Sequence, residues 1–147
     1  MKVDLHCHTH LSDGKHPAAF LIERALANEV THLAITDHDY AQSHSDTEGS
    51  GDLTLIPGVE ISGHWDSLEL HIVGLFIDVT NVTLQNLLTN QQLLRHARVA
   101  KMDEKLAALG TPGMLAHLSD QPAIALTRSH VADFLVSSGV CKTRQKA

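Results

Sequence analysis

Histidine and acidic residues recur where short β-rich segments of this sequence end. His6 and His8 close the first such segment, and His38 lies between two aspartates after the second. Glu60 lies near the end of the third. In barrels of parallel strands, catalytic groups gather at the carboxyl ends of the strands. Three successive segments of this kind therefore predict one shared site at one edge of a sheet.

The order of the β-rich and amphipathic segments predicts an α/β fold. We expect strands over residues 2–6, 31–36, 53–62 and 68–78, the third of them broken at Pro57–Gly58. We expect helices over 17–30, 83–109 and 127–139, a short helical or irregular piece over 114–120, and a polar loop over 43–52. This alternation is typical of a mostly parallel sheet.

Composition limits the class of protein. With 147 residues, 43% of them hydrophobic, the chain is one globular domain or part of a larger one. It has no apolar run that would span a membrane and no leader for export, and its two cysteines lie far apart, so we expect a cytoplasmic location. A formal net charge of −6 argues against a broad basic surface for long nucleic acids.

The chain is rich in histidine, with twelve histidines against three Phe, one Trp and one Tyr. Histidine is the commonest metal ligand, so this excess favours a metal site. His6 and His8 lie two positions apart on a strand, so they share a face with Asp4, while Cys7 points away. Solvated or core histidines also form such pairs. Asp13 lies in a Ser-Asp-Gly turn that would bring its carboxylate back towards the strand end, which favours a set of metal ligands.

Glu60 and His71 extend the candidate ligand set. By itself, His71 in an otherwise apolar strand is typical of a hydrogen-bonded core histidine. Together with His38 and Glu60, it is better interpreted as a metal ligand. Imidazoles with carboxylates suit Zn²⁺, Mn²⁺ or Fe²⁺ better than Ca²⁺ or Mg²⁺. A bridging carboxylate, for which Glu60 is the natural candidate, would hold two cations close together. Close metal pairs supply hydroxide near neutral pH and hold phosphoryl oxygens, which favours phosphoester hydrolysis.

Five ordered motifs resemble those of the PHP (polymerase and histidinol phosphatase) superfamily. They are DLHCHTHLSDG, LAITDHD, IPGVEIS, LHIVGLFID and LTRSHVADFLV. They are most similar to those of its branch of nucleotide phosphatases and short-RNA 5′→3′ exonucleases, and the match runs from residue 3 to the C-terminus. The resemblance implies a distorted, TIM-like (β/α) barrel with up to three divalent cations.

The resemblance also implies which residues would bind each cation. The first would be bound by His6, His8 and Glu60, the second by Asp13 and His38, and the third by Glu60, His71 and His130. Asp4 and Asp37 would orient these ligands. The role of His130 rests on the resemblance alone, because nothing in its local sequence indicates a ligand.

Arg128 lies two residues before His130 and is a candidate to bind a substrate phosphate. A solvent-exposed arginine near a helix start is the equally weighted alternative. Relatives commonly carry an arginine where this chain has Asp133, and an acid there would repel a phosphate.

The Ser-Asp-x-His type motif that normally closes a PHP site is missing from this sequence. A (β/α) barrel usually takes roughly 250 residues. We therefore expect residues 1–147 to be the N-terminal portion of a PHP domain, a partial barrel without its C-terminal strands. An open sheet edge has unpaired backbone groups, so the chain is a truncated product, a fragment, or one that pairs with another copy of itself.

Three functions remain open at this point. The first is a metal-dependent phosphoesterase in which a metal-bound hydroxide attacks a small phosphorylated substrate, such as a nucleotide or short oligonucleotide. The second is a non-catalytic, metal-binding or structural PHP fragment, in which the second cation, with only Asp13 and His38, is held weakly. The third is an enzyme similar to histidinol phosphatase, although the LTRSHVADFLV and HIVGLFID segments fit the nucleotide branch better.

Overall fold

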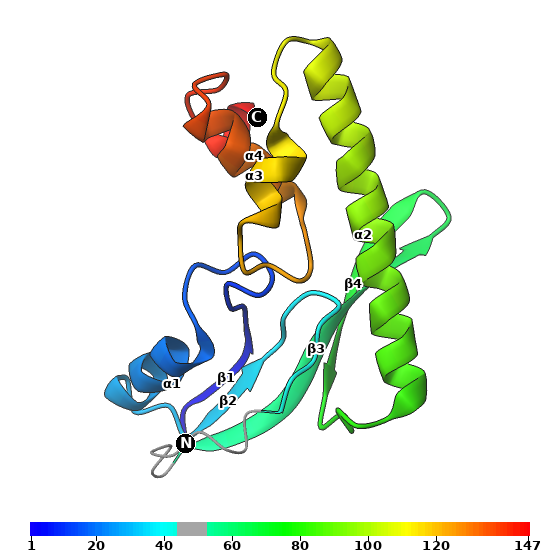
Figure 1. The fold of residues 1–147 in the computed structure, drawn as a ribbon. Coiled ribbons are helices and arrows are strands. Elements are labelled where there is room, and N and C mark those ends of the chain that lie inside the picture. Colours follow the sequence, from blue (N-terminus) through cyan, green and yellow to red (C-terminus); the bar gives the residue numbers. More distant parts are fainter. Residues whose placement is uncertain (44–52) are drawn as a thin grey trace.

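A curled four-stranded sheet flanked by helices forms the body of the protein (Figure 1). The computed structural model describes residues 1–43 and 53–147, so most of the polar loop expected over 43–52 lies outside the described residues. The strands are β1 (Val3–Cys7), β2 (His32–Ile35), β3 (Thr54–Trp65) and β4 (Leu68–Leu75). The helices are α1 (Ala18–Ala27), α2 (Val82–Ala108), α3 (Met114–Ser119), α4 (Arg128–Ser137) and the 3₁₀ turn η1 (Arg144–Lys146).

The strands lie in chain order, β1-β2-β3-β4. The pairings of β1 with β2 and of β2 with β3 are parallel, as expected, but β4 runs antiparallel to β3. Trp65 pairs with Leu68, so the two strands are joined by a two-residue turn in which Asp66 has φ +53°. Such a short turn can only join antiparallel strands. The sheet is therefore mixed, with β4 as a hairpin arm of β3.

The break expected in the third strand at Pro57–Gly58 is wrong, because β3 runs without interruption for 12 residues. Its pairing with β2 ends at Pro57, opposite Ile35, and its pairing with β4 begins at Gly58, opposite Leu75. The strand thus changes partners at the dipeptide rather than ending there. Gly58 is required at this position, because a Cβ would lie 2.8 Å from Thr36 Cγ2.

Local signals set the ends of the long helix α2. Asn81 is its N-cap, and the Asn81 side chain accepts the Leu84 N–H at 3.0 Å. After Leu109, the C-cap, Gly110 adopts φ +86° and turns the chain away. The helix therefore begins and ends within about a turn of the predicted limits.

Three small cores hold the helices on the sheet and on one another. Buried residues of α1, of β2 and of the position just before β3 form the first: Ile22, Ala25, Leu33, Ile35 and Leu53. Leu88 of α2 packs on Val59 of β3 and on Ala41 in the second. The far end of α2 packs on α3 and α4 in the third, through Val99, Met114, Leu118, Leu126, Phe134 and Leu135. Helix α2 therefore joins the sheet to the C-terminal helices (Figure 1).

The sheet ends in two edge strands, β1 and β4. Leu68, Leu70 and Ile72 of β4 are exposed, and Val3 of β1 is 44% exposed. The architecture is a mixed α/β half-barrel, and covering of an open edge by a second copy stays a prediction. Among the described residues, no helix combines the length and apolar character needed to cross a membrane.

Candidate metal centre

The first ligands come from β1 and the loop that follows it. His6 belongs to β1, His8 follows its last residue, and Asp13 is folded back so that its Oδ1 lies 2.9 Å from His8 Nδ1. The chain reverses because the Gly14 N–H binds the Thr9 carbonyl at 2.9 Å. A Cβ at Gly14 would lie 2.1 Å from the His8 carbonyl oxygen, so no other residue fits this reversal.

Glu60 lies at the centre of the histidine cluster. Its Oε2 is 3.0 Å from His6 Nε2 and 2.9 Å from His8 Nε2, and its Oε1 is 3.1 Å from His71 Nδ1. The residue lies in the middle of β3, not near its end as expected. It still meets the others, because β3 continues past the end of β2 and Glu60 bridges to His38 there. The antiparallel return of β4 then brings His71 opposite Ser62, on the same face as Glu60.

His38 reaches two carboxylates. Its Nε2 is 3.6 Å from Asp13 Oδ2, and its Nδ1 is 3.6 Å from Glu60 Oε2, both beyond ordinary hydrogen-bond length. The Nδ1 atom is buried without a hydrogen-bond partner. Buried polar atoms are rarely left unsatisfied, so this nitrogen fits a ligand atom directed at a cation.

The side chains form three overlapping groups, each able to hold one cation. They are His6, His8 and Glu60; His8, Asp13 and His38; and His38, Glu60 and His71. In the first group the ligand atoms lie 2.9 to 3.1 Å apart. Ligand atoms about 2.1 Å from one ion lie roughly 3.0 to 3.4 Å from each other, so the donor set and its spacing fit a small divalent cation.

The charges of the cluster are balanced against one another. The nearby ring of His38 and the hydrogen bond from His8 hold the pKa of Asp13 well below its usual range, although burial opposes this. Burial lowers the pKa of His8, but the hydrogen bond to Asp13 and the nearby carboxylates outweigh it, so the pKa of His8 is raised. Burial likewise raises the pKa of Glu60, but His6 and the other histidines lower it overall. The histidines and the two carboxylates therefore stabilise each other's charged forms.

Asp37 anchors the loop that carries the first ligands. It is 3% exposed and accepts the Thr9 N–H and the Thr9 hydroxyl, each at 2.7 Å, and the Ser12 hydroxyl at 2.5 Å. Ser12 Oγ in turn lies 3.4 Å from His8 Nδ1. Asp37 thus positions His8 through the loop instead of touching a ligand ring directly.

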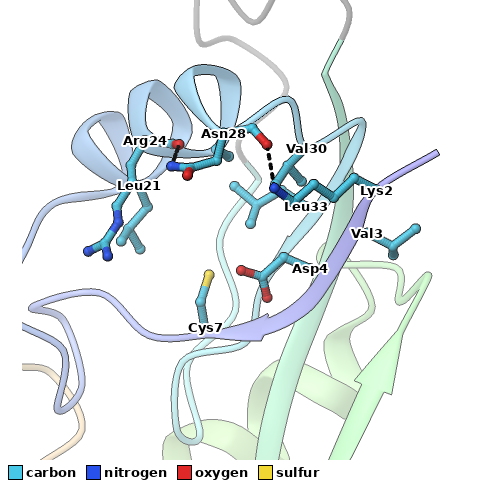
Figure 2. A pocket seen from close by; sticks show the side chains of 10 residues that line it. Lys2, Val3, Asp4, Cys7, Leu21, Arg24, Asn28, Val30 and Leu33 are labelled. Carbon is cyan, nitrogen blue, oxygen red and sulfur yellow. Dashed lines mark hydrogen bonds between the residues drawn. The ribbon is translucent and has the colours of Figure 1, made fainter.

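Asp4 lies away from the histidine cluster, contrary to the expectation that it shares the face of His6 and His8. The pairing of β1 with β2 shifts register between Asp4 and Cys7. This irregularity brings both residues to a cavity of about 430 Å³ between β1 and α1, which Leu21 and Leu33 also line (Figure 2). Asp4 Oδ1 accepts the His6 backbone N–H at 3.5 Å, so its contact is with the strand and not with a ring.

His130 is not in any of the three groups found among the described residues. It lies at the start of α4, where its Nδ1 accepts the Thr127 backbone N–H at 3.0 Å and completes a capping box. A neutral histidine that accepts at Nδ1 carries its proton on Nε2, which is then a donor. This arrangement does not bring His130 to Glu60 and His71, and its role at a third cation stays a prediction.

Arg128 is paired with an acid that the sequence did not single out. Its Nη2 lies 2.8 Å from Glu69 Oε2, and the side chain is 70% exposed. Asp133, the residue expected to repel a phosphate, is paired with Arg144. That ion pair offsets the negative charge of Asp133.

A buried network that the sequence did not reveal supports the cluster. Asp39, fully buried, accepts the Ser62 N–H at 2.9 Å and binds the buried guanidinium of Arg95. Its own N–H donates to the Glu60 carbonyl at 2.9 Å. Arg95 also donates to the Ser62 hydroxyl and to the Leu126 carbonyl. The sequence did not predict that Arg95 is buried, because an arginine in an amphipathic helix is normally exposed. The Asp-His-Asp run was the only local sign of this network.

A protein-family comparison decides the classification of this site. The model described as PHP domain matches residues 4–105, a range that contains the three ligand groups. The chain belongs to the PHP family. The family match therefore covers the whole histidine and carboxylate cluster of this PHP chain, whereas α4 lies beyond the match.

The curated relatives of this PHP chain include proteins named as an exoribonuclease and as a phosphatase. It is 43% identical over 143 residues to the 5′-3′ exoribonuclease Rnm of Escherichia coli, covering 92% of this chain and 48% of that protein. It is 34% identical over 146 residues to a 3′,5′-nucleoside bisphosphate phosphatase of Chromobacterium violaceum, covering 95% and 51%. The chain spans about half the length of the curated relatives it matches.

Two solved structures have a fold similar to that of this chain. An amidohydrolase from Chromobacterium violaceum, with bound sulfate and no metal, superposes with a TM-score of 0.82 at 32% identity, over 99% of this chain and 53% of that one. A structure described as a metal-dependent phosphoesterase, from Bifidobacterium adolescentis, also gives 0.82, at 28% identity, over 98% and 52%. The half-barrel of this PHP chain therefore corresponds to about half of each larger fold.

Proposed function

We propose that this chain carries the metal-binding half of a phosphoesterase that hydrolyses a small phosphorylated substrate, a nucleotide or a short oligonucleotide. The observation that carries the proposal is the position of Glu60, whose two carboxylate oxygens lie 2.9 to 3.1 Å from nitrogen atoms of three histidines. One carboxylate shared in this way can hold two cations side by side. That arrangement suits phosphoryl transfer, in which paired cations stabilise the attacking and leaving oxygens.

In this proposal some residues bind the cations and others position the loop or bind the substrate. His6, His8, Asp13, His38, Glu60 and His71 would hold Mn²⁺, Zn²⁺ or Fe²⁺. Bound cations of this kind neutralise phosphoryl oxygens and make water acidic enough to act near neutral pH. Asp37 keeps the loop of His8 and Asp13 in place, and Arg128 offers a guanidinium to a phosphate at the mouth of the site.

The relatives support the substrate class. Two of them are named an exoribonuclease and a 3′,5′-nucleoside bisphosphate phosphatase, and both names refer to substrates built from nucleotides. A non-catalytic, metal-binding role is the second candidate, favoured by the fact that this chain spans about half of each relative. Ligands supplied by the remainder of a barrel would be needed for turnover in that case.

The deciding experiment measures metal content and hydrolysis on the same sample. We expect the manganese-loaded chain to bind more than one ion and to release phosphate from nucleotides bearing a 5′ or 3′ phosphate. The Glu60→Gln variant should lose both properties, whereas Glu23→Gln, on the exposed face of α1, should keep them. Normal metal content without hydrolysis, even after addition of the separately expressed C-terminal half of the Escherichia coli relative, would favour the non-catalytic role.

A further inference from the structure

The hairpin of β3 and β4 carries an apolar stripe that the described part of the chain leaves exposed. Trp65 pairs with Leu68, and every second residue of a strand points to the same face. The exposed side chains on that face are Trp65, Leu68, Leu70 and Ile72. Gly63 lies on the same face, and a Cβ there would meet no described atom within 4 Å. This face of the hairpin is therefore open.

Strand β4 is also an edge of the sheet with an unbroken register. Among the described residues its strand neighbour is β3, on one side, so the backbone groups that face the other side have no strand partner. All eight residues pair regularly with β3, and their sequence, LELHIVGL, contains no lysine or proline. Proteins usually protect an exposed edge with such residues, with a bulge or with a very short strand. A long apolar edge without them is a site of association.

The opposite edge, β1, has features that hinder such pairing. It has five residues, and its pairing with β2 shifts register between Asp4 and Cys7. The cavity beside it is lined by the charged side chains of Lys2, Asp4 and Arg24 as well as by apolar ones. Of the two edges, β4 is therefore the one that fits another strand.

A second copy of the chain fits this edge because β4 is complementary to itself. Two copies of one strand related by a twofold axis run antiparallel, and residues directly opposite each other must lie on the same face. With the axis at Leu70, the two Leu70 side chains meet. Leu68 of each copy then lies opposite Ile72 of the other. This position of the axis therefore gives three apolar cross-strand pairs, the unit that stabilises a sheet.

The polar residues on the other face of β4 select the same position. With the axis at Leu70, Glu69 lies opposite His71 of the second copy, an acid opposite an imidazole. An axis at Glu69 would place two carboxylates opposite each other, and an axis at His71 would place two imidazoles there, both less favourable pairs. Glu69 already binds Arg128 at 2.8 Å, but a carboxylate has about four acceptor sites, so it can accept a further N–H.

We propose that β4 is a self-association surface, on which a second copy of this chain adds its own β4 antiparallel about a twofold axis at Leu70. One sheet would then continue through both copies. The axis is perpendicular to that sheet, so both histidine clusters lie on the same face of it.

The oligomeric state of the chain as purified tests this surface without relying on hydrolysis. We expect sedimentation equilibrium over about a hundredfold range of concentration to show the mass doubling as the concentration rises. Leu70→Lys places two ammonium groups opposite each other at the axis, and it should raise the dissociation constant of the dimer at least about a hundredfold. The matched control is Leu93→Lys on α2, where the leucine is 62% exposed, and it should dimerise as wild type does. Circular dichroism shows whether each variant is folded.

Disulfide formation tests the position of the axis. In a chain that carries Cys7→Ser and Cys141→Ser, Leu70→Cys places the two new thiols at the axis, where opposite Cβ atoms lie about 5 Å apart, close to the reach of a disulfide. Ile72→Cys places them about 14 Å apart, four residues along the strands. We expect mild oxidation to crosslink the Leu70→Cys chain and to leave the Ile72→Cys chain as single chains on a denaturing gel.

Three outcomes overturn the proposal. The first is a chain that stays monomeric over the whole range of concentration. The second is a dimer that persists in Leu70→Lys or that crosslinks equally at both positions, because its interface then lies elsewhere. The third is a monomer that forms a stable complex with the separately expressed C-terminal half of the Escherichia coli relative, a complex lost in Leu70→Lys, which would assign the edge to that half and not to a second copy.

Discussion

Arg95 Nε donates a 2.6 Å hydrogen bond to Asp39 Oδ2, and both side chains are buried. The pair joins residues 56 positions apart, one in helix α2 and one directly after a metal-ligand candidate, His38. Arg95 reaches the Leu126 carbonyl as well, one residue before the cap of α4. One guanidinium therefore ties the sheet, the long helix and the C-terminal helices to the loop that holds His38.

Replacing Arg95 should destabilise the protein strongly. Arg95→Met leaves the Asp39 carboxylate buried without its partner, which typically costs about 3 to 5 kcal/mol. Urea unfolding of the metal-free chain measures this loss. Arg24→Met, an exposed arginine on α1, is the matched control and should change the free energy of unfolding by less than about 0.5 kcal/mol. A loss below about 1 kcal/mol for Arg95→Met would show that the pair is not structural.

The double variant separates the pair from the packing of its members. Asp39→Asn combined with Arg95→Met removes both charges, so we expect it to lose less stability than the sum of the two single variants. A coupling free energy of about 1 to 3 kcal/mol is the expected scale for buried neighbours. Additive losses would contradict a direct interaction.

Glu60 should control how many cations the chain binds. Glu60→Gln keeps the shape of the side chain but removes the charge shared by two of the three ligand groups. We expect the variant to bind at least one ion fewer than wild type, because only the group of His8, Asp13 and His38 remains complete. Elemental analysis after dialysis measures the ion count, and thermal unfolding shows whether the metal-free variant is folded. An unchanged ion count would remove Glu60 from the ligands.

Stability should respond to pH in opposite ways with and without metal. In the metal-free chain the pKa of His8 is raised, so its protonated form adds stability below about pH 6.5 and loses it as the pH rises through the raised pKa. Cations need the neutral ring, so their affinity falls by about tenfold per pH unit for each proton displaced below that pKa. The Tm difference between loaded and metal-free protein should therefore widen from pH 6 to 8. A constant difference would contradict proton displacement at His8.

Cys7 should be slow to react with alkylating reagents. Burial, together with the charges of Asp4 and Asp37, raises the pKa of the Cys7 thiol to about 12, and only the thiolate is a good nucleophile. The Cys141→Ser variant isolates this thiol, and intact mass after iodoacetamide treatment at pH 8 follows its reaction. We expect labelling at least tenfold slower than in urea. Equal rates in the two conditions would show that Cys7 is accessible.

The family motifs and strand ends of the sequence predicted most of the metal centre. His6, His8, Asp13, His38, Glu60 and His71 meet as expected, since each lies at or near a strand whose period is visible locally. The ligand roles themselves stay predictions until ions are counted. The sequence interpretation failed where side-chain direction depended on a neighbouring strand, as for Asp4, which a register shift in β1 carries to the cavity of Cys7.

The sequence by itself determined which chemical groups the chain has, which segments form strands and helices, and which family its motifs resemble. These depend on short-range periodicity, caps and turn residues, all of which can be recognised from neighbouring positions in the sequence. Only the tertiary structure decided that β4 turns back on β3, that Arg95 is buried on Asp39, and that Glu69 lies between Arg98 and Arg128. The hairpin depends on how β4 pairs with β3, and the two arginine contacts join residues many positions apart. Helix α2, which packs on the sheet through Leu88, brings its arginines within reach of these distant side chains.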